Sequence, residues 1–400
     1  MKLNQVPVFL IIGLLAGVIA SCDKLMPKPP PDDELLDGPI AELNNAQLGQ
    51  HLNGDMAFND QIFTAETGLG PVFVATSCGS CHAADGKGHP FTTLTRFGQT
   101  DSTGNKFLHL GGPLLQNRAL PGFEPEQIPS GATSAKFTPP IITGLGFIEL
   151  VSDQDILAMA DPNDSDGDGI SGVVNWNVIP PYVTPRPDAV SQNGKYICRI
   201  GKKASVYNLL QQTVTAYNQD IGITSIFNPL DVYTLLNIEP EVSSTTINDV
   251  VFYLQTLKAP IQRNQDDEEI QKGKNVFIQT GCAACHKPTL KTGLSNIPGL
   301  SNKEVHPYTD LLLHDMGSGL DDGYTEGSAK TNEWRTAPLW GLGLAPNSQG
   351  GQYFLLHDGR AKTIEDAIAL HGGEASDRRA KYYNLSESDR QALLRFLKSL

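Results

Sequence analysis

Two five-residue segments carry the clearest chemistry in this sequence. Cys78–His82 and Cys282–His286 both read C-x-x-C-H. This spacing lets two thiols add to the two vinyl groups of one porphyrin while the adjoining imidazole binds the iron. The segments therefore predict two covalently attached haem c groups, held by Cys78, Cys81, His82, Cys282, Cys285 and His286.

Paired cysteines also occur in redox-active dithiols and in zinc sites. A thioredoxin-like pair needs a βαβ context, which this sequence does not show around either segment. A zinc site would need the two pairs close together. Two complete C-x-x-C-H segments therefore favour haem attachment.

Composition and charge limit the other function classes. The chain has 400 residues, with 30 basic and 44 acidic side chains and a net charge of −14. Such a charge repels phosphate backbones, so we expect no nucleic-acid partner. The 39 glycines and 27 prolines predict many turns and long loops. The length is sufficient for two compact domains.

The N-terminus resembles an export signal. Lys2 precedes an apolar stretch from Val6 to Ala20, and Ile19–Cys22 has the small-residue pattern of a bacterial lipoprotein cleavage site. The stretch is short for a membrane span, although an uncleaved anchor is the alternative. We therefore predict a signal peptide over 1–22, lipidation of Cys22, and a Pro-rich tether and N-terminal segment over 23–59. The expected location is the cell envelope outside the cytoplasm, on the periplasmic face or the outer membrane, with the membrane contacted by the lipid anchor alone.

The remaining sequence contains two pairs of similar segments, which indicate a duplicated unit. Thr138–Pro140 is followed by Gly-Leu-Gly at 144–146, and Thr336–Pro338 by Gly-Leu-Gly at 341–343. Apolar periodicity predicts helices over 246–257, 266–277 and 386–400. We expect a mainly α fold with long loops and two cytochrome c-like domains, over 60–262 and 263–400, the first with large insertions.

Several longer segments resemble the bacterial di-haem oxidoreductase family of peroxidase-like proteins, often labelled thiol oxidoreductases. These segments are Asp166–Gly172, Leu313–Gly317, Glu333–Gly341 and Phe354–Ala375. The family is distantly similar to di-haem cytochrome c peroxidases and MauG-like enzymes, in which one haem accepts electrons and the other meets the oxidant. The resemblance implies an electron-transferring oxidoreductase that reduces hydrogen peroxide at its first haem.

Other functions and partners stay open at this point. The chain could be a pure electron-carrier cytochrome, or a haem-bearing surface module that binds a partner. As an enzyme it would receive electrons from a small redox donor protein or a quinol-linked chain.

The resemblance also implies axial ligands. His371, just before Gly372, matches the position of the sixth ligand of the C-terminal haem in the peroxidase relatives. A structural histidine beside a Gly-Gly turn is the alternative. For the first iron, His89 and His109 are both candidates, and an open position is the third option.

A carboxylate and an acidic loop are further candidates. Glu149 follows the first Gly-Leu-Gly segment and has no counterpart in the second, so it is either the acid/base for peroxide or an ordinary surface glutamate. Asp164, Asp166 and Asp168 alternate around glycines as in calcium loops. Asn175 stands where an EF-hand would have glutamate, so the alternatives are a loop-stiffening calcium ion and a plain turn.

Two positions depart from the family pattern. Cys198 stands at a glycine position, so a catalytic thiol has no support. Lys202 stands where the family has tryptophan. If that tryptophan carries electrons between the haems, Trp176, Trp334 or Trp340 would have to replace it, although most such aromatic residues simply pack.

Overall fold

The computed structural model describes residues 30–98, 100–101 and 104–400. The predicted signal peptide and Cys22 lie outside the described residues. Within the described part, no helix is both long and apolar enough to cross a membrane.

The described part of the chain is mixed rather than mainly helical, with about 34 % of it in α, 3-10 or π helices. The α-helices are α2 (Asn45–Asp55), α3 (Leu145–Glu149), α4 (Asp153–Met159), α5 (Leu209–Gln219), α6 (Ser244–Thr256), α7 (Glu268–Thr280), α8 (Ala345–Ser348), α9 (Ile364–Ala369), α10 (Ser376–Tyr383) and α11 (Glu387–Ser399). The expected mainly α class was therefore too simple. The loops of the protein pair with each other as short antiparallel strands. Helical periodicity in the sequence does not predict such strands.

In residues 30–98, 100–101 and 104–400, these strands form five two-stranded sheets, β1–β5, β2–β6, β3–β4, β10–β11 and β12–β13, and one three-stranded sheet in the order β7-β9-β8. The strands are β1 (Val72–Phe73), β2 (Leu94–Phe97), β3 (Thr100–Asp101), β4 (Gly104–Asn105), β5 (Arg118–Ala119), β6 (Ser134–Phe137), β7 (Asn175–Asn177), β8 (Ser191–Gln192), β9 (Lys195–Cys198), β10 (Leu290–Lys291), β11 (Glu304–Val305), β12 (Leu313–Asp315) and β13 (Glu333–Arg335).

The three helices expected from the sequence are present as α6, α7 and α11. Asp267 caps α7 by accepting hydrogen bonds from the N–H groups of Glu269 and Ile270. Ser386 caps α11 by accepting a hydrogen bond from Asp389 N–H.

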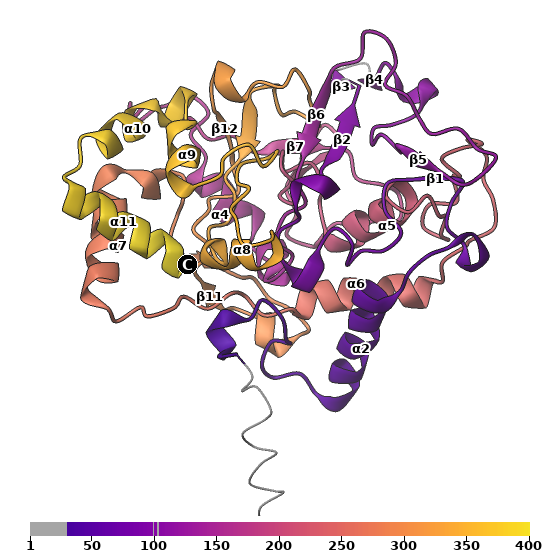
Figure 1. Cartoon of the computed structure of the whole chain (residues 1–400), viewed down its shortest axis with the longest axis horizontal. Helices are drawn as coiled ribbons and strands as arrows, with labels where there is room; N and C mark the ends of the chain where they lie inside the picture. The colour runs from indigo at the N-terminus through magenta and orange to yellow at the C-terminus, as the bar shows by residue number, and fades with distance from the viewer. Residues whose placement is uncertain (1–29, 99, 102–103) are drawn as a thin grey trace, which may run out of the picture.

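The helices fall into two groups (Figure 1). α2 and α5 pack on α6 at one end of the molecule, and α11 packs on α7 at the other. Each group contains a close crossing at a glycine. A Cβ added at Gly54 of α2 would lie 2.1 Å from the carbonyl oxygen of Asp249, and one at Gly273 of α7 would lie 2.0 Å from that of Ala392. The matching crossings identify α2 as the counterpart of α7.

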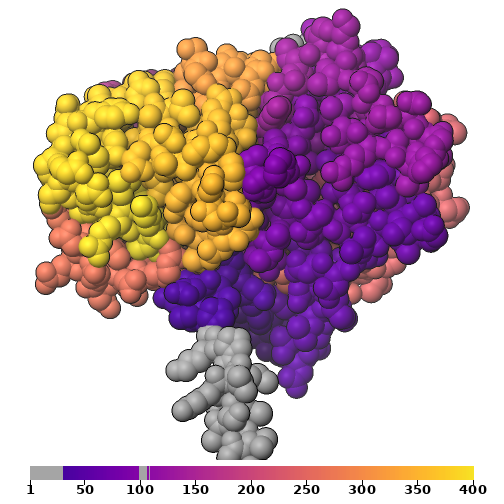
Figure 2. Space-filling view, viewed as in Figure 1, coloured from indigo at the N-terminus to yellow at the C-terminus, as the bar shows by residue number. Residues whose placement is uncertain are grey.

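The two halves of the chain share a core. One cluster of buried apolar residues joins Phe147, Ile148 and Val151 to Leu311, Leu312 and Trp340. Isolated bridges at Val151–Thr292 and Val173–Leu313 also cross the boundary expected at 262/263. The space-filling view shows the corresponding colours in broad contact (Figure 2). The two-domain division stays a prediction, and the packing between the halves is extensive.

Candidate haem-binding cavity

The first C-x-x-C-H segment forms one tight turn after β1. The N–H groups of Cys81 and His82 both donate to the carbonyl oxygen of Cys78, at 3.1 Å each. Residues three and four positions apart in such a turn lie on the same side. Both thiols and the imidazole therefore line one cavity.

The second segment follows α7. Gly281 ends that helix with φ of 87°, a left-handed conformation that glycine adopts at little cost. Cys282–Ala284 then form a short 3-10 turn, and His286 N–H donates to the carbonyl oxygen of Cys282 at 3.0 Å. The same local geometry thus arises twice.

Both segments open onto one continuous cavity of about 790 Å³. Apolar side chains from both helix groups line it, among them Phe58, Ile142, Leu254, Leu339 and Leu397. A large apolar cavity with a few polar groups is the usual form of a cofactor site.

Burial keeps both motif histidines and the two thiols of the first segment neutral. It lowers the pKa of His82 and of His286 to about 4, and it raises the pKa of Cys78 to about 12 and of Cys81 to about 11. Iron binds the neutral imidazole, so both histidines are in the required form. Neutral thiols beside them are the groups that add to porphyrin vinyls.

His371 faces His286 across the cavity. The two ring centres are 6.5 Å apart. Nδ1 of His286 donates to the carbonyl oxygen of Tyr308 at 3.0 Å, and Nδ1 of His371 to that of Ala367 at 2.6 Å, which leaves both Nε2 atoms free. Two metal–imidazole bonds of about 2 Å, with the half-width of each ring, span roughly this distance. The pair therefore fits a metal ion between the rings, and His371 as a ligand stays a prediction that this geometry supports.

No such pair exists at the first segment. His89 Nδ1 accepts a hydrogen bond from Phe91 N–H, and neither His89 nor His109 lines the cavity. The other cavity histidines have partners: His314 contacts Asp310 and Glu374, and His357 contacts Asp322. Among the described residues, no second histidine with a free nitrogen faces His82.

Comparison with known proteins identifies the family. The family described as "Di-haem oxidoreductase, putative peroxidase" matches residues 34–97 and 132–400. The chain belongs to the di-haem oxidoreductase family. Membership makes haem its cofactor and redox chemistry its function, and both C-x-x-C-H segments lie within the matched residues.

The other comparisons add little. No curated protein matches the chain. A solved structure of hydrazine synthase from Kuenenia stuttgartiensis, pressurised with xenon, is similar over 94 % of this chain and 95 % of that chain, with 14 % sequence identity and a TM-score of 0.39.

An acid that no sequence motif marks also lines the haem cavity. Asp220 directly follows α5 and faces the first segment, where its charge is one cause of the raised pKa values of Cys78 and Cys81. Burial raises the pKa of Asp220 itself to about 7, although Arg96 opposes the shift. Arg96 also lines the cavity, and its guanidinium pairs with Glu326. A single aspartate at a helix end carries no motif, so the sequence contained no signal for it.

Glu149 lies elsewhere in this di-haem oxidoreductase. One carboxylate oxygen accepts from Leu209 N–H at 2.7 Å, and the other accepts from the Gln255 amide at 2.8 Å. Glu149 is not among the cavity-lining residues. It is neither the expected surface glutamate nor placed to meet peroxide, because both oxygens join the start of α5 to α6.

The acidic loop gathers a slightly different set of carboxylates. Asp161, Asp164 and Asp166 bring oxygen atoms within 4.8 Å of one another. Asp168 instead contacts Arg378 at 2.9 Å. The calcium ion stays a prediction, and Asp161 is better placed than Asp168 to hold it.

The structure places Cys198 and the three tryptophans that could replace the family tryptophan at position 202. Cys198 is buried, and burial raises its pKa to about 12, so the thiol is inert. Trp334 and Trp340 line the cavity, whereas Trp176 does not. Trp334 stacks on His357 with ring centres 3.7 Å apart.

Proposed function

We propose that this chain is an exported di-haem c oxidoreductase that reduces hydrogen peroxide at the haem of the first segment. The second haem would receive electrons and deliver them. The asymmetry of the cavity carries the proposal: His286 faces His371, whereas the surroundings of His82 hold the titratable Asp220 and no second free imidazole among the described residues.

The reaction joins one hydrogen peroxide, two electrons and two protons to give two water molecules. The haem groups supply the redox chemistry that breaks the O–O bond. The Asp220 carboxylate can take a proton from one peroxide oxygen and return it to the other. The guanidinium of Arg96 also lines the cavity, where it pairs with Glu326.

The decisive experiment combines spectroscopy with turnover of the holoprotein. Electron paramagnetic resonance should show one high-spin and one low-spin haem, and peroxide should be consumed with a small reductant. Asp220→Asn should lower turnover by about 10²-fold or more while leaving both haem spectra intact. Asp60→Asn, the same change at an exposed site, is the matched control.

Two closed low-spin haems without peroxide turnover would overturn this proposal and favour an electron carrier. Equal turnover in Asp220→Asn and Asp60→Asn would remove Asp220 from the reaction.

Export and anchoring belong to the same proposal. Attachment of haem c outside the cytoplasm agrees with a lipoprotein signal, and a tethered enzyme can meet a small redox protein or a quinol-linked chain at the membrane. Cys22→Ser should abolish incorporation of labelled fatty acid and release the protein from the membrane fraction. Unchanged partitioning would show that the apolar stretch or a partner holds it.

A further inference from the structure

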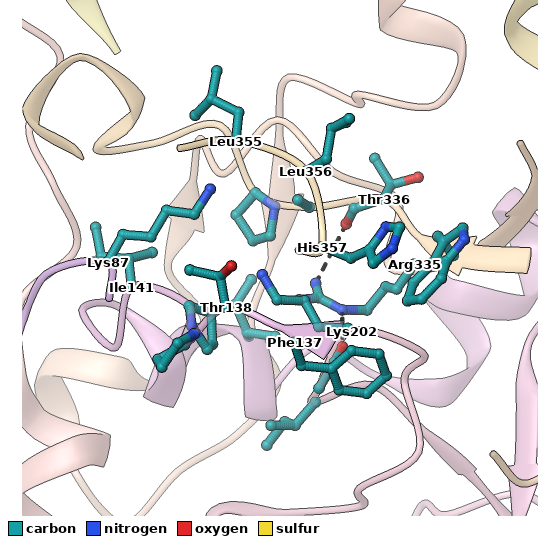
Figure 3. A pocket seen from close by; sticks show the side chains of 18 of the residues that line it. Lys87, Phe137, Thr138, Ile141, Lys202, Arg335, Thr336, Leu355, Leu356 and His357 are labelled. Atoms are coloured by element: carbon teal, nitrogen blue, oxygen red, sulfur yellow. Dashed lines mark hydrogen bonds between the residues drawn. The ribbon is translucent and has the colours of Figure 1, made fainter. Parts of the chain in front are cut away.

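Three cationic side chains converge in the haem cavity. Lys87 follows the first C-x-x-C-H segment, Lys202 lies after β9, and Arg335 ends β13. The close-up shows the three side chains reaching into the same space beside Thr138 and His357 (Figure 3). Segments far apart in the sequence thus place three positive groups together.

These cations lack acidic partners. Among the described residues, no carboxylate oxygen lies within 4.0 Å of the side-chain nitrogens of Lys87, Lys202 or Arg335. Arg335 donates to the carbonyl oxygens of Gly201, at 2.8 Å, and Thr336, at 3.3 Å. The guanidinium therefore has neutral partners and retains unused donors.

The acids that act on the cluster are already paired. Asp358 faces Lys87 and Lys202, but it holds Arg360 at 2.6 Å. Asp310 acts on Arg335, but it contacts His314 at 2.9 Å. The cluster therefore has no acidic group of its own to compensate the charge of its protonated side chains.

Three cationic groups are energetically unfavourable in a buried site without a bound anion. Burial lowers the pKa of Lys87 to about 8 and of Arg335 to about 10. Burial also lowers the pKa of Lys202 well below its usual range, and the neighbouring cations Lys87 and Arg335 lower it further. An anion bound among the three would restore the charged forms, because opposite charges in a cavity favour ionisation.

We infer that Lys87, Lys202 and Arg335 form a site for carboxylate groups, into which the haem propionates extend. The inference rests on the proposed haem content. The planar guanidinium of Arg335 suits two-point binding of a carboxylate, and the lysines add point charges. The same chemistry would accept a small free oxyanion, which is the other source of the ligand.

The site would also tune the haem. A nearby positive charge favours the reduced state, because reduction adds an electron to the iron centre. Lys202→Met keeps most of the side-chain volume and removes the charge. It should lower the equilibrium constant for reduction of one haem about tenfold, or about 59 mV for a one-electron couple. Lys202→Arg should recover most of the loss.

The measurement is a spectroelectrochemical redox titration of the holoprotein, without peroxide. Lys195→Met, which removes an exposed lysine, is the matched control and should leave both potentials unchanged. If Lys202→Met fails to incorporate haem, Lys87→Met provides the same test from the other side of the site.

Added formate distinguishes the two sources of the carboxylate. If haem propionates fill the site, formate should leave the wild-type potentials unchanged. If a free oxyanion fills it, formate should shift a wild-type potential with saturation, and Lys202→Met should lose that response. Either result supports the site.

Potentials in Lys202→Met and Lys87→Met equal to those of Lys195→Met, with no formate response, would overturn the inference. Because no peroxide is used, that outcome is separate from failure of the proposed peroxidase function. A shifted potential in a protein that does not consume peroxide would retain the site and remove the enzyme.

Discussion

At the scale of single residues, tautomer and burial decide what each histidine can do. Five histidines line the cavity, but His314 and His357 have carboxylate partners, whereas His286 and His371 turn Nδ1 toward backbone carbonyls. Of these four histidines, His286 and His371 have the arrangement that leaves Nε2 for a metal.

Replacement of His371 tests whether this histidine binds the iron of the second haem. In His371→Gly, the second haem should change from low spin to high spin, because the iron loses a strong axial ligand while the covalent attachment at Cys282 and Cys285 is untouched. Electronic absorption and paramagnetic resonance measure the change, with His306→Gly at an exposed site as control. A low-spin spectrum retained at both haems would show that another group binds the iron.

The titration of Asp220 predicts a pH profile. Its pKa is raised to about 7 by burial, and the carboxylate is the form that accepts the first proton from peroxide. Turnover should therefore rise as pH increases through about 7 and level off above it. Asp220→Asn should remove the rise, whereas Glu149→Gln should keep it, because Glu149 joins α5 to α6 outside the cavity. A profile that disappears in Glu149→Gln instead would return the acid/base role to that residue.

At the scale of elements, two helix crossings depend on a missing side chain. Gly54 and Gly49 both lie in α2, but a Cβ at position 54 would meet the backbone of Asp249 and the Cβ of Tyr253, at 2.1 and 2.6 Å, whereas one at position 49 meets nothing within 4 Å. The crossing of α2 and α6 therefore requires glycine at one position and merely tolerates it at the other.

Two alanine substitutions compare these positions. Gly54→Ala should destabilise the protein by about 1–3 kcal/mol, because the helices must move apart. Gly49→Ala should stabilise it by roughly 0.5–1 kcal/mol through helix propensity. Denaturant unfolding of the holoprotein measures both. Equal effects of the two substitutions would contradict the close packing of α2 on α6.

At the scale of the whole molecule, the cofactors complete the core. The cavity lies between the two helix groups, and both contribute apolar lining. Its walls gain packing partners when haem fills it, so haem content and stability should be linked.

The number of covalent haems per chain tests whether the cofactors complete the core. The protein should contain two haems per chain that resist acid-acetone extraction, measured as the pyridine haemochrome. Replacing both Cys282 and Cys285 by serine should leave one covalent haem, and the thermal unfolding midpoint should fall because half of the cavity loses its attached group. Cys198→Ser, which removes a buried thiol outside the motifs, should retain two haems. One haem or none in the wild type would contradict the duplicated site.

The sequence by itself determined what depends on neighbouring residues. The two C-x-x-C-H turns, α6, α7, α11 and the Ser386 cap follow from local spacing, because a turn or a helix is built by bonds between residues a few positions apart. His371 was placed by a family resemblance that spans a continuous segment.

Tertiary structure alone decided what meets across the cavity. Asp220, Lys87, Lys202 and Arg335 come from separate segments and carry no shared motif, so their presence along one cavity follows from packing of the chain around one apolar space. The same packing turned Glu149 away from that space and toward α5. The charge of a buried side chain depends on these long-range neighbours, and a linear pattern does not contain them.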